Sequence, residues 1–207
     1  MKLAILGATG RIGSHLQSWA LDTGHSVRAL ARHPEALRPA PGPAVIGGNA
    51  LDAGAVAEVI AGTDAVLSAL APRGKKNPGL LAGAAANMVA AMEETGPRRL
   101  ICVSAGGPWV RDDPNVNWLI KLVLPRVLAT TFADIRGMED TIRASGLDWT
   151  LVRASQLTDG PLTRHYRVAP DFTSRGGRKI SRADLAHFIE ATLTDGGWLK
   201  SAPALAY

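Results

Sequence analysis

Three glycines near the start of the chain have the spacing of a phosphate-binding turn. The segment Gly7-Ala-Thr-Gly10-Arg-Ile-Gly13 follows a short strand pattern at 2–6 and opens a helical pattern. The first glycine permits a tight turn, the second lets the backbone approach a pyrophosphate, and the third lets the helix pack closely on the strand. Amide groups at the helix start then face the phosphates. The spacing predicts dinucleotide binding, the alternative being a turn kept only for packing.

A basic residue stands where the second strand should end. In dinucleotide-binding folds a carboxylate at this place binds the ribose 2′-hydroxyl of NAD. This chain instead has Arg32 there, and a guanidinium binds a 2′-phosphate through paired hydrogen bonds. Arg32 therefore favours NADP(H) over NAD(H), the alternative being an exposed charge at a strand end.

The chain lacks the tyrosine and lysine, four residues apart, with which many short-chain reductases deliver a proton. Its two tyrosines are Tyr166, which is followed four residues later by Pro170, and Tyr207. This counts against reduction of simple ketones, which need a proton at the nascent alkoxide. Ser104 follows an apolar strand pattern and is the candidate catalytic residue. It could hydrogen-bond a substrate carbonyl or the cofactor's carboxamide; the alternative is a small residue at a strand end.

The remaining reactive side chains have no catalytic spacing. His15 and His187 lie in helical patterns and are expected to be packed or solvent-facing, and Cys102 lies in an apolar strand pattern as an inert thiol. A single cysteine excludes internal disulfides. Without a CxxC or HExxH spacing, the sequence predicts no metal site.

The region 105–133 is rich in aromatic, apolar and proline residues and directly follows a strand pattern. In an α/β sheet, a substrate site lies outside the carboxyl ends of the strands. Trp109, Trp118 and Phe132 could offer stacking surfaces for a planar acceptor. The alternative is that these aromatics simply cap the core.

The elements that would position these residues alternate between short strands and longer helices, which is typical of a parallel sheet covered on both faces. We expect one α/β domain over 1–207, a doubly wound parallel sheet (Rossmann fold) with a small C-terminal extension on the substrate side. The expected strands are 2–6, 26–31, 43–46, 64–68, 98–103 and 148–152, and the expected helices are 11–22, 52–61, 77–95, 116–128, 132–145 and 182–194.

Two helix ends carry capping signals. Gly24 stands just past the first helix, where a C-terminal glycine cap belongs. Ser181-Arg-Ala-Asp184 resembles a capping box, with Ser181 as the N-cap.

The formal net charge of +5 suggests an anionic partner. The basic residues form three clusters, namely Arg28, Arg32 and Arg38; Arg73, Lys75 and Lys76; and Arg175, Arg178, Lys179 and Arg182. The clusters lack interleaved aromatics, so we expect no nucleic-acid partner. With no secretion signal and no apolar stretch long enough to span a membrane, the protein is expected to be soluble and cytoplasmic.

In its ordered set of motifs the chain resembles the atypical short-chain dehydrogenase/reductases with an NAD(P)H-binding domain, the group of the NmrA-like and flavin reductase-like (biliverdin reductase B) proteins. The resemblance covers nearly the whole chain, and its later segments look most like the flavin reductase branch. The matching segments are 7–13, 29–32, 62–67, 86–92, 103–104, 144–147, 159–163 and 180–186.

The resemblance implies a role for each cofactor-binding position. The glycine turn would hold the pyrophosphate, Arg32 the 2′-phosphate, and Asn49, which stands where flavin reductase has an aspartate, would lie beside the adenine. Ser104 would lie near the nicotinamide, over which the stretch 153–157 closes in relatives. The cofactor-binding positions predicted in this way are Gly7, Thr9, Gly10, Arg11, Ile12, Gly13, Arg32, Asn49, Ala50, Ala69, Leu70, Ala71, Ser104, Arg153 and Gln156.

The resemblance and the residues together predict an NADPH-dependent reductase of a flavin-, quinone- or biliverdin-like conjugated acceptor, which can take its proton from water. The segments 105–133 and 154–180 would form the substrate side. The alternative is a non-catalytic NADP(H)-binding redox sensor of the NmrA-like kind. We expect a small planar acceptor as partner, no membrane, and a monomer or weak homo-oligomer.

Overall fold

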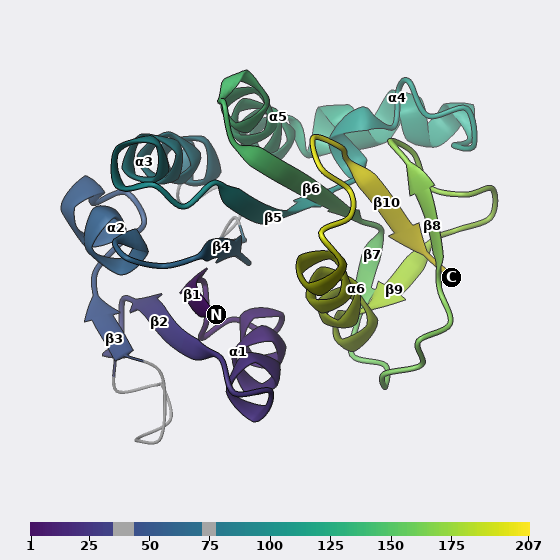
Figure 1. The fold of residues 1–207 in the computed structure, drawn as a ribbon. Helices are drawn as coiled ribbons and strands as arrows, with labels where there is room; N and C mark the ends of the chain where they lie inside the picture. Colours follow the sequence, from purple (N-terminus) through teal and green to yellow (C-terminus); the bar gives the residue numbers. More distant parts are fainter. Residues whose placement is uncertain (35–43, 72–77) are drawn as a thin grey trace.

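The structure, a computed structural model, describes residues 1–34, 44–71 and 78–207 (Figure 1). Four members of the predicted basic clusters, Arg38, Arg73, Lys75 and Lys76, lie outside these residues. Within them, no helix is both long enough and apolar enough to cross a membrane.

The centre of the fold is an eight-stranded sheet with the order β3-β2-β1-β4-β5-β6-β10-β8. All neighbouring strands run parallel except β8, which pairs antiparallel with β10. The strands are β1 (Lys2–Leu6), β2 (Ser26–Ala31), β3 (Ala44–Gly47), β4 (Ala65–Ser68), β5 (Arg99–Ala105), β6 (Asp148–Ala154), β8 (Arg167–Pro170) and β10 (Pro203–Ala206). The order 3-2-1-4-5-6 is that of a dinucleotide-binding Rossmann sheet, which confirms the predicted fold class.

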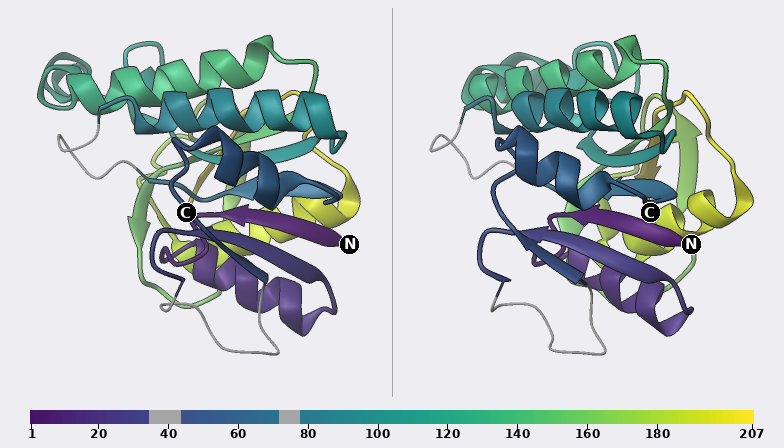
Figure 2. Two further views of the ribbon diagram at one scale, coloured as in Figure 1. Left: turned by 90° about the vertical axis from the view of Figure 1, so that its left-hand side faces the viewer. Right: turned by 60° about the vertical axis from the view of Figure 1, so that its left-hand side comes forward.

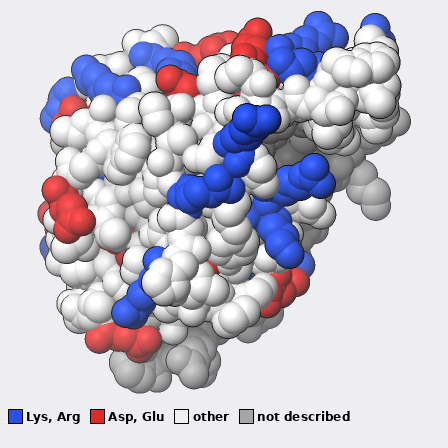
Figure 3. All heavy atoms as spheres, turned by 90° about the vertical axis from the view of Figure 1, so that its right-hand side faces the viewer, with Lys and Arg blue, Asp and Glu red and all other residues white. Residues whose placement is uncertain are grey.

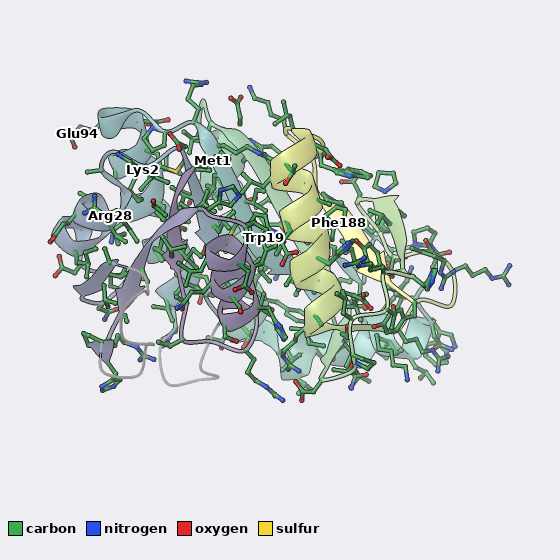
Figure 4. The ribbon with its side chains drawn as sticks, turned by 60° about the horizontal axis from the view of Figure 1, so that its bottom comes forward. Met1, Lys2, Trp19, Arg28, Glu94 and Phe188 are labelled. Carbon is green, nitrogen blue, oxygen red and sulfur yellow. The ribbon has the colours of Figure 1, made fainter. Side chains whose placement is uncertain are left out.

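Helices cover both faces of the sheet (Figure 2). One face packs against α2 (Ala53–Ile60), α3 (Leu80–Thr95) and α5 (Ala129–Ala144), and the other against α1 (Gly13–Asp22) and α6 (Arg182–Asp195). β1 shows how the two cores divide, because Leu3 and Ile5 belong to the α1–α6 core whereas Ala4 and Leu6 belong to the other. In Figure 4, Trp19 of α1 and Phe188 of α6 mark the α1–α6 side of the sheet.

The six predicted strands and six predicted helices are all present, with boundaries shifted by a few residues. The predicted helix 116–128 is observed as α4 (Trp118–Val127), and the structure adds the 3₁₀ turn η3 (Gly107–Trp109) and four strands after residue 155 that were not predicted from the sequence. Of these, β8 and β10 extend the main sheet, while β7 (Gln156–Thr158) and β9 (Lys179–Ser181) pair separately.

Both capping predictions are confirmed, one of them with a change. Gly24 has a positive φ of 79° directly after the end of α1. Ser181 caps α6, its hydroxyl accepting a 3.0 Å hydrogen bond from the Asp184 amide. The return bond of the box is made through Tyr207, whose hydroxyl accepts from the Ser181 amide at 3.0 Å and donates to Asp184 at 2.6 Å. The last strand is thereby tied to the start of α6.

Candidate functional site

The glycine-rich turn has a backbone that only glycine fits. Gly7 has a φ of 84°, and a Cβ there would lie 2.8 Å from the carbonyl carbon of Ala69. A Cβ on Gly13 would lie 2.1 Å from the Gly7 carbonyl oxygen, so α1 starts as close to the turn as backbone atoms allow. The N-cap of α1 is Ile12, which offers no side-chain oxygen to the first amides of the helix. Apart from the Ser14 amide, which donates to the Gly10 carbonyl oxygen at 2.8 Å, these amides are suited to an anionic ligand.

A cavity of about 230 Å³ opens beside this turn, outside the carboxyl ends of the first four strands. It brings together nine of the predicted cofactor positions, which come from four separate segments of the chain. The lining residues are Gly7, Thr9, Gly10, Leu30, Ala31, Arg32, Gly48, Asn49, Ala50, Ala69, Leu70, Ala71 and Leu80. Leu30, Ala31, Gly48 and Leu80 were not predicted.

Among the described residues, Arg32 is the only cation that lines this cavity, and it stands with its exposed side chain directly after β2. No Asp or Glu is found among the lining residues that the structure describes. Asn49, on the neighbouring segment, uses its side-chain oxygen to accept from the Leu51 amide at 3.2 Å. This end of the cavity is thus positive and offers amide and guanidinium donors.

Six predicted cofactor positions lie outside the lining of this cavity. Ile12 and Gly13 are buried where α1 begins, and Arg11 is exposed and forms an ion pair with Asp159. The same carboxylate pairs with Arg182 at 2.6 Å, so it connects the glycine turn to the start of α6. Gln156 is exposed on β7. The last two, Ser104 and Arg153, lie side by side on β5 and β6.

The sequence analysis missed Glu139, a fully buried residue of α5 that contacts both Ser104 and Arg153. The Ser104 hydroxyl donates to Glu139 Oε1 at 2.6 Å. Arg153 donates from Nε at 3.1 Å and from Nη2 at 2.7 Å, one bond to each carboxylate oxygen. Arg143 adds a bond of 3.2 Å to Oε2. Glu139 is one of several charged residues in the sequence of α5. Nothing in the neighbouring sequence indicates that it is buried or that it binds Ser104 and Arg153.

The donors around Glu139 keep it ionised. Burial alone would raise its pKa, but the hydrogen bonds and charge of Arg153, the Ser104 hydroxyl and the charge of Arg143 together hold the pKa below its ordinary value. A buried carboxylate of this kind accepts hydrogen bonds and has no proton to donate at neutral pH.

Arg153 is held on three sides. Besides Glu139, its Nη1 donates to the Asp171 carbonyl oxygen at 2.9 Å, and its guanidinium carbon lies 4.4 Å from the centre of the Trp109 ring. The Nε1 atom of this Trp109 ring and the Oγ atom of Ser155, two residues after Arg153, are buried without a hydrogen-bond partner among the described residues. Ser155 was not singled out by the sequence analysis, although it lies within the stretch 153–157 that the resemblance marked.

The three aromatic residues predicted to meet an acceptor have different environments. Trp109 is half-buried against Arg153, whereas Phe132 is only 4% exposed, its ring lying against Gly107. Trp118 is 67% exposed on α4, a helix in which no residue is buried. α4 follows β5 through η3 and lies beyond the start of α5 (Figure 1).

The other reactive side chains are occupied elsewhere. Burial raises the pKa of the Cys102 thiol to about 12, which agrees with an inert core residue. The Tyr166 hydroxyl lies 2.8 Å from His187 Nδ1, and burial followed by the charges of Asp184 and Glu190 raises its pKa to about 12. Neither tyrosine lies with Ser104 and Glu139.

Lysine and arginine side chains gather on the side of the molecule that carries β8 and β9 (Figure 3). Arg175, Arg178 and Lys179 of the third predicted cluster are exposed here, next to Gln156, which pairs with Lys179 across β7 and β9.

Comparison with known proteins decides the family. A family model described as NAD(P)H-binding matches residues 7–196, which is most of the chain. The chain belongs to the NAD(P)H-binding family.

Solved structures agree in fold with this NAD(P)H-binding protein over its whole length. The oxidoreductase ylbE of Lactococcus lactis has a TM-score of 0.84 at 17% identity, with 100% of this chain and 90% of that chain covered. ChuY of Escherichia coli O157:H7, described as an anaerobillin reductase, has a TM-score of 0.83 at 21% identity, with 100% and 97% covered. A wide-type short-chain dehydrogenase/reductase of Veillonella parvula, solved in complex with NADP, has a TM-score of 0.80 at 20% identity, with 100% and 94% covered. The fold is thus one that oxidoreductases use.

The curated sequence relatives are much longer proteins that match only part of this chain. An uncharacterized protein of Mycobacterium bovis is 35% identical over 109 residues, which are 51% of this chain and 12% of that protein. An uncharacterized protein of Mycobacterium tuberculosis matches to the same extent. The chain therefore spans a small part of the length of the curated relatives it matches.

The site fits the cofactor of the family. The crowded backbone of Gly7 and Gly13 and the uncapped start of α1 suit a pyrophosphate, and the segments that line the cavity suit the adenosine half of a dinucleotide. In this NAD(P)H-binding protein, Ser104 and Arg153 lie at the carboxyl ends of the next two strands along the sheet.

Proposed function

We propose that this protein is an NADPH-dependent oxidoreductase that reduces a planar, conjugated acceptor of the flavin, quinone or biliverdin kind. The observation that carries the proposal is the cavity joining the glycine turn to Arg32, with Ser104 at the end of a strand further along the same edge of the sheet. Open α/β sheets bind their ligands at this edge. Bound NADPH supplies the hydride, and the chain supplies binding and orientation.

The choice of NADPH over NADH rests on Arg32. Its guanidinium is the only charged group that the described part of the chain brings to the cavity, and the 2′-phosphate is the only charge that distinguishes the two cofactors. Within residues 1–34, 44–71 and 78–207, the lining has no carboxylate of the kind that would favour the 2′-hydroxyl of NADH.

The kind of acceptor is proposed from the proton chemistry of the site. The Tyr166 hydroxyl is hydrogen-bonded to His187 and the Tyr207 hydroxyl to Asp184, so neither is placed to deliver a proton to an acceptor beside Ser104. Glu139 is held as a carboxylate. An acceptor that spreads the incoming charge over a conjugated system, and takes its proton from water, needs no such donor.

The acceptor side is proposed to consist of 105–133 and 154–180. Trp109 and the exposed Trp118 offer aromatic faces there. Phe132 is buried and packs on Gly107 of the η3 turn, so its role is to support that turn. The neighbour ChuY, described as an anaerobillin reductase, has the same fold and supports a large conjugated acceptor by analogy.

The test is the loss of nicotinamide absorbance with purified protein, NADPH or NADH, and a panel of FMN, riboflavin, quinones and biliverdin. Steady turnover that prefers NADPH supports the proposal, and the ranking of acceptors begins to define the substrate. Tight NADPH binding without turnover on any acceptor would refute it and favour a redox sensor, which the lack of a proton-donating tyrosine also fits.

A further inference from the structure

The hydroxyl of Ser104 has one proton, and its direction is fixed by what surrounds Glu139. Glu139 Oε1 accepts this proton, with 2.6 Å between it and Ser104 Oγ. The other neighbours of the carboxylate, Arg153 and Arg143, are guanidinium groups that can only donate. The roles in the Ser104–Glu139 bond therefore cannot be exchanged. Ser104 can therefore offer a ligand only its lone pairs, as an acceptor.

We infer that Glu139 is a positioning residue that makes Ser104 a hydrogen-bond acceptor for the N–H of the nicotinamide carboxamide. A serine whose proton is already bound cannot also donate to the carbonyl of a substrate. Of the two roles open to Ser104, the contact with the cofactor is the one its surroundings permit. This rests on the proposed placement of the nicotinamide beside Ser104, although it does not require turnover.

The surroundings of Glu139 hold it in the orientation that this role requires. Arg153 binds both carboxylate oxygens, and is itself fixed by the Asp171 carbonyl oxygen and the Trp109 ring. A purely structural ion pair between α5 and β6 would need only the Arg153 contacts. The short bond to Ser104 is the additional feature, and it lies at the carboxyl end of β5, the edge of the sheet at which the cofactor is proposed to bind.

The experiment compares the affinities of three ligands by equilibrium titration. NADP⁺ carries the carboxamide, its 3-acetylpyridine analogue replaces the amide NH₂ with a methyl group, and 2′,5′-ADP lacks the nicotinamide altogether. A neutral hydrogen bond contributes enough for the wild type to favour NADP⁺ over the analogue by roughly two- to tenfold through this contact.

Two variants should remove that preference without affecting 2′,5′-ADP. Ser104→Ala deletes the accepting oxygen, whereas Ser104→Thr keeps it and should retain the preference. In Glu139→Gln, the amide NH₂ is expected at the Oε1 position, where it meets one guanidinium N–H, rather than at Oε2, where it would meet two. It would then donate to Ser104 and free the serine proton, so the preference should vanish or reverse toward the acetyl analogue. Asp140→Asn, on the exposed side of the same helix, is the matched control.

The outcomes separate this inference from the proposed function. A preference that persists in both Ser104→Ala and Glu139→Gln overturns it, as does an equal loss of affinity for all three ligands, which would mean a structural role. Should Glu139→Gln fail to fold, the contrast between Ser104→Ala and Ser104→Thr decides alone. A preference that depends on Ser104, in a protein without turnover, would support the inference while refuting the reductase. Turnover without a preference that depends on Ser104 would support the reductase and overturn the inference.

Discussion

Replacing Arg32 is the most direct way to test how this protein selects its cofactor. Arg32→Ala should weaken NADPH binding and leave NADH binding nearly unchanged, because only NADPH carries the 2′-phosphate. A hydrogen bond to a charged group contributes about 1.5–3 kcal/mol, which corresponds to roughly ten- to a hundredfold in affinity. Because Arg32 is exposed at the rim of the cavity, solvent and salt screen it, and we expect a loss near the lower end, about tenfold.

Arg32→Asp extends the same argument to a change of sign. The carboxylate would repel the 2′-phosphate and could accept a hydrogen bond from the ribose 2′-hydroxyl, so the preference should shift toward NADH. Raising the salt concentration should weaken NADPH binding by the wild type more than by Arg32→Ala, because the screened charge pair is present only in the former.

The assay is titration of each protein with NADPH and NADH, followed by nicotinamide fluorescence. Arg98→Ala is the control, since Arg98 is an exposed arginine that pairs with Asp148 at the opposite edge of the sheet. Equal losses for both cofactors in Arg32→Ala would mean that the residue supports the local fold. No loss for either would mean that the 2′-phosphate lies elsewhere, and the reasoning from the end of β2 would be refuted.

Three further predictions concern the glycine turn, the acceptor side and the C-terminal strand. Gly13→Ala places a Cβ 2.1 Å from the Gly7 carbonyl oxygen, so it should abolish NADPH binding and lower the free energy of unfolding by about 1–3 kcal/mol. The control Gly146→Ala, with open space around its Cβ, should change neither quantity in binding titrations and urea unfolding. Equal effects of the two substitutions would contradict the close approach of α1 to the turn. Trp118→Ala should raise the acceptor KM while changing NADPH affinity little and stability by less than about 0.5 kcal/mol, and an unchanged KM across the acceptor panel would remove this residue from the site. Despite burial, hydrogen bonds led by that from Tyr207 hold the pKa of Asp184 at about 2, below its ordinary 3.8, so its stabilising effect is complete above that ordinary value and is lost as the pH falls toward 2. Tyr207→Phe removes the leading hydrogen bond and raises the folded-state pKa of Asp184, so the loss should be smaller and should be complete at a higher pH in unfolding curves taken between about pH 2 and 5. Identical pH profiles would count against the Asp184–Tyr207 bond.

The parts of the site that could be predicted from sequence are those made by local chain geometry. The glycine spacing and the position of Arg32 after a strand depend on residues adjacent in the chain, and the cavity indeed joins Gly7, Gly10 and Arg32. Glu139 could not be found in this way. It is 35 residues from Ser104, and only the packing of α5 on the sheet makes the two neighbours.

The same distinction applies to the fold. The long apolar strands and amphipathic helices could be predicted because each segment has a hydrophobic pattern of its own that indicates its structure. The short strands β8 and β10 exist because each pairs with the other and β10 with β6, and a pairing of distant segments leaves no local pattern. Tyr207 likewise looks unremarkable in sequence, although its hydroxyl joins Ser181 and Asp184.

The arrangement around Ser104 narrows the chemistry further than the sequence could. A proton donor for a simple ketone would need a titratable proton beside the hydride acceptor, yet Glu139 is kept as an anion by Arg153 and Arg143. The Ser104 proton is in turn bound to that anion. Giving it up would leave an alkoxide next to a carboxylate, which is electrostatically unfavourable in a buried site. For the proposed reductase we therefore expect an acceptor that stabilises the transferred electron pair itself until water protonates it.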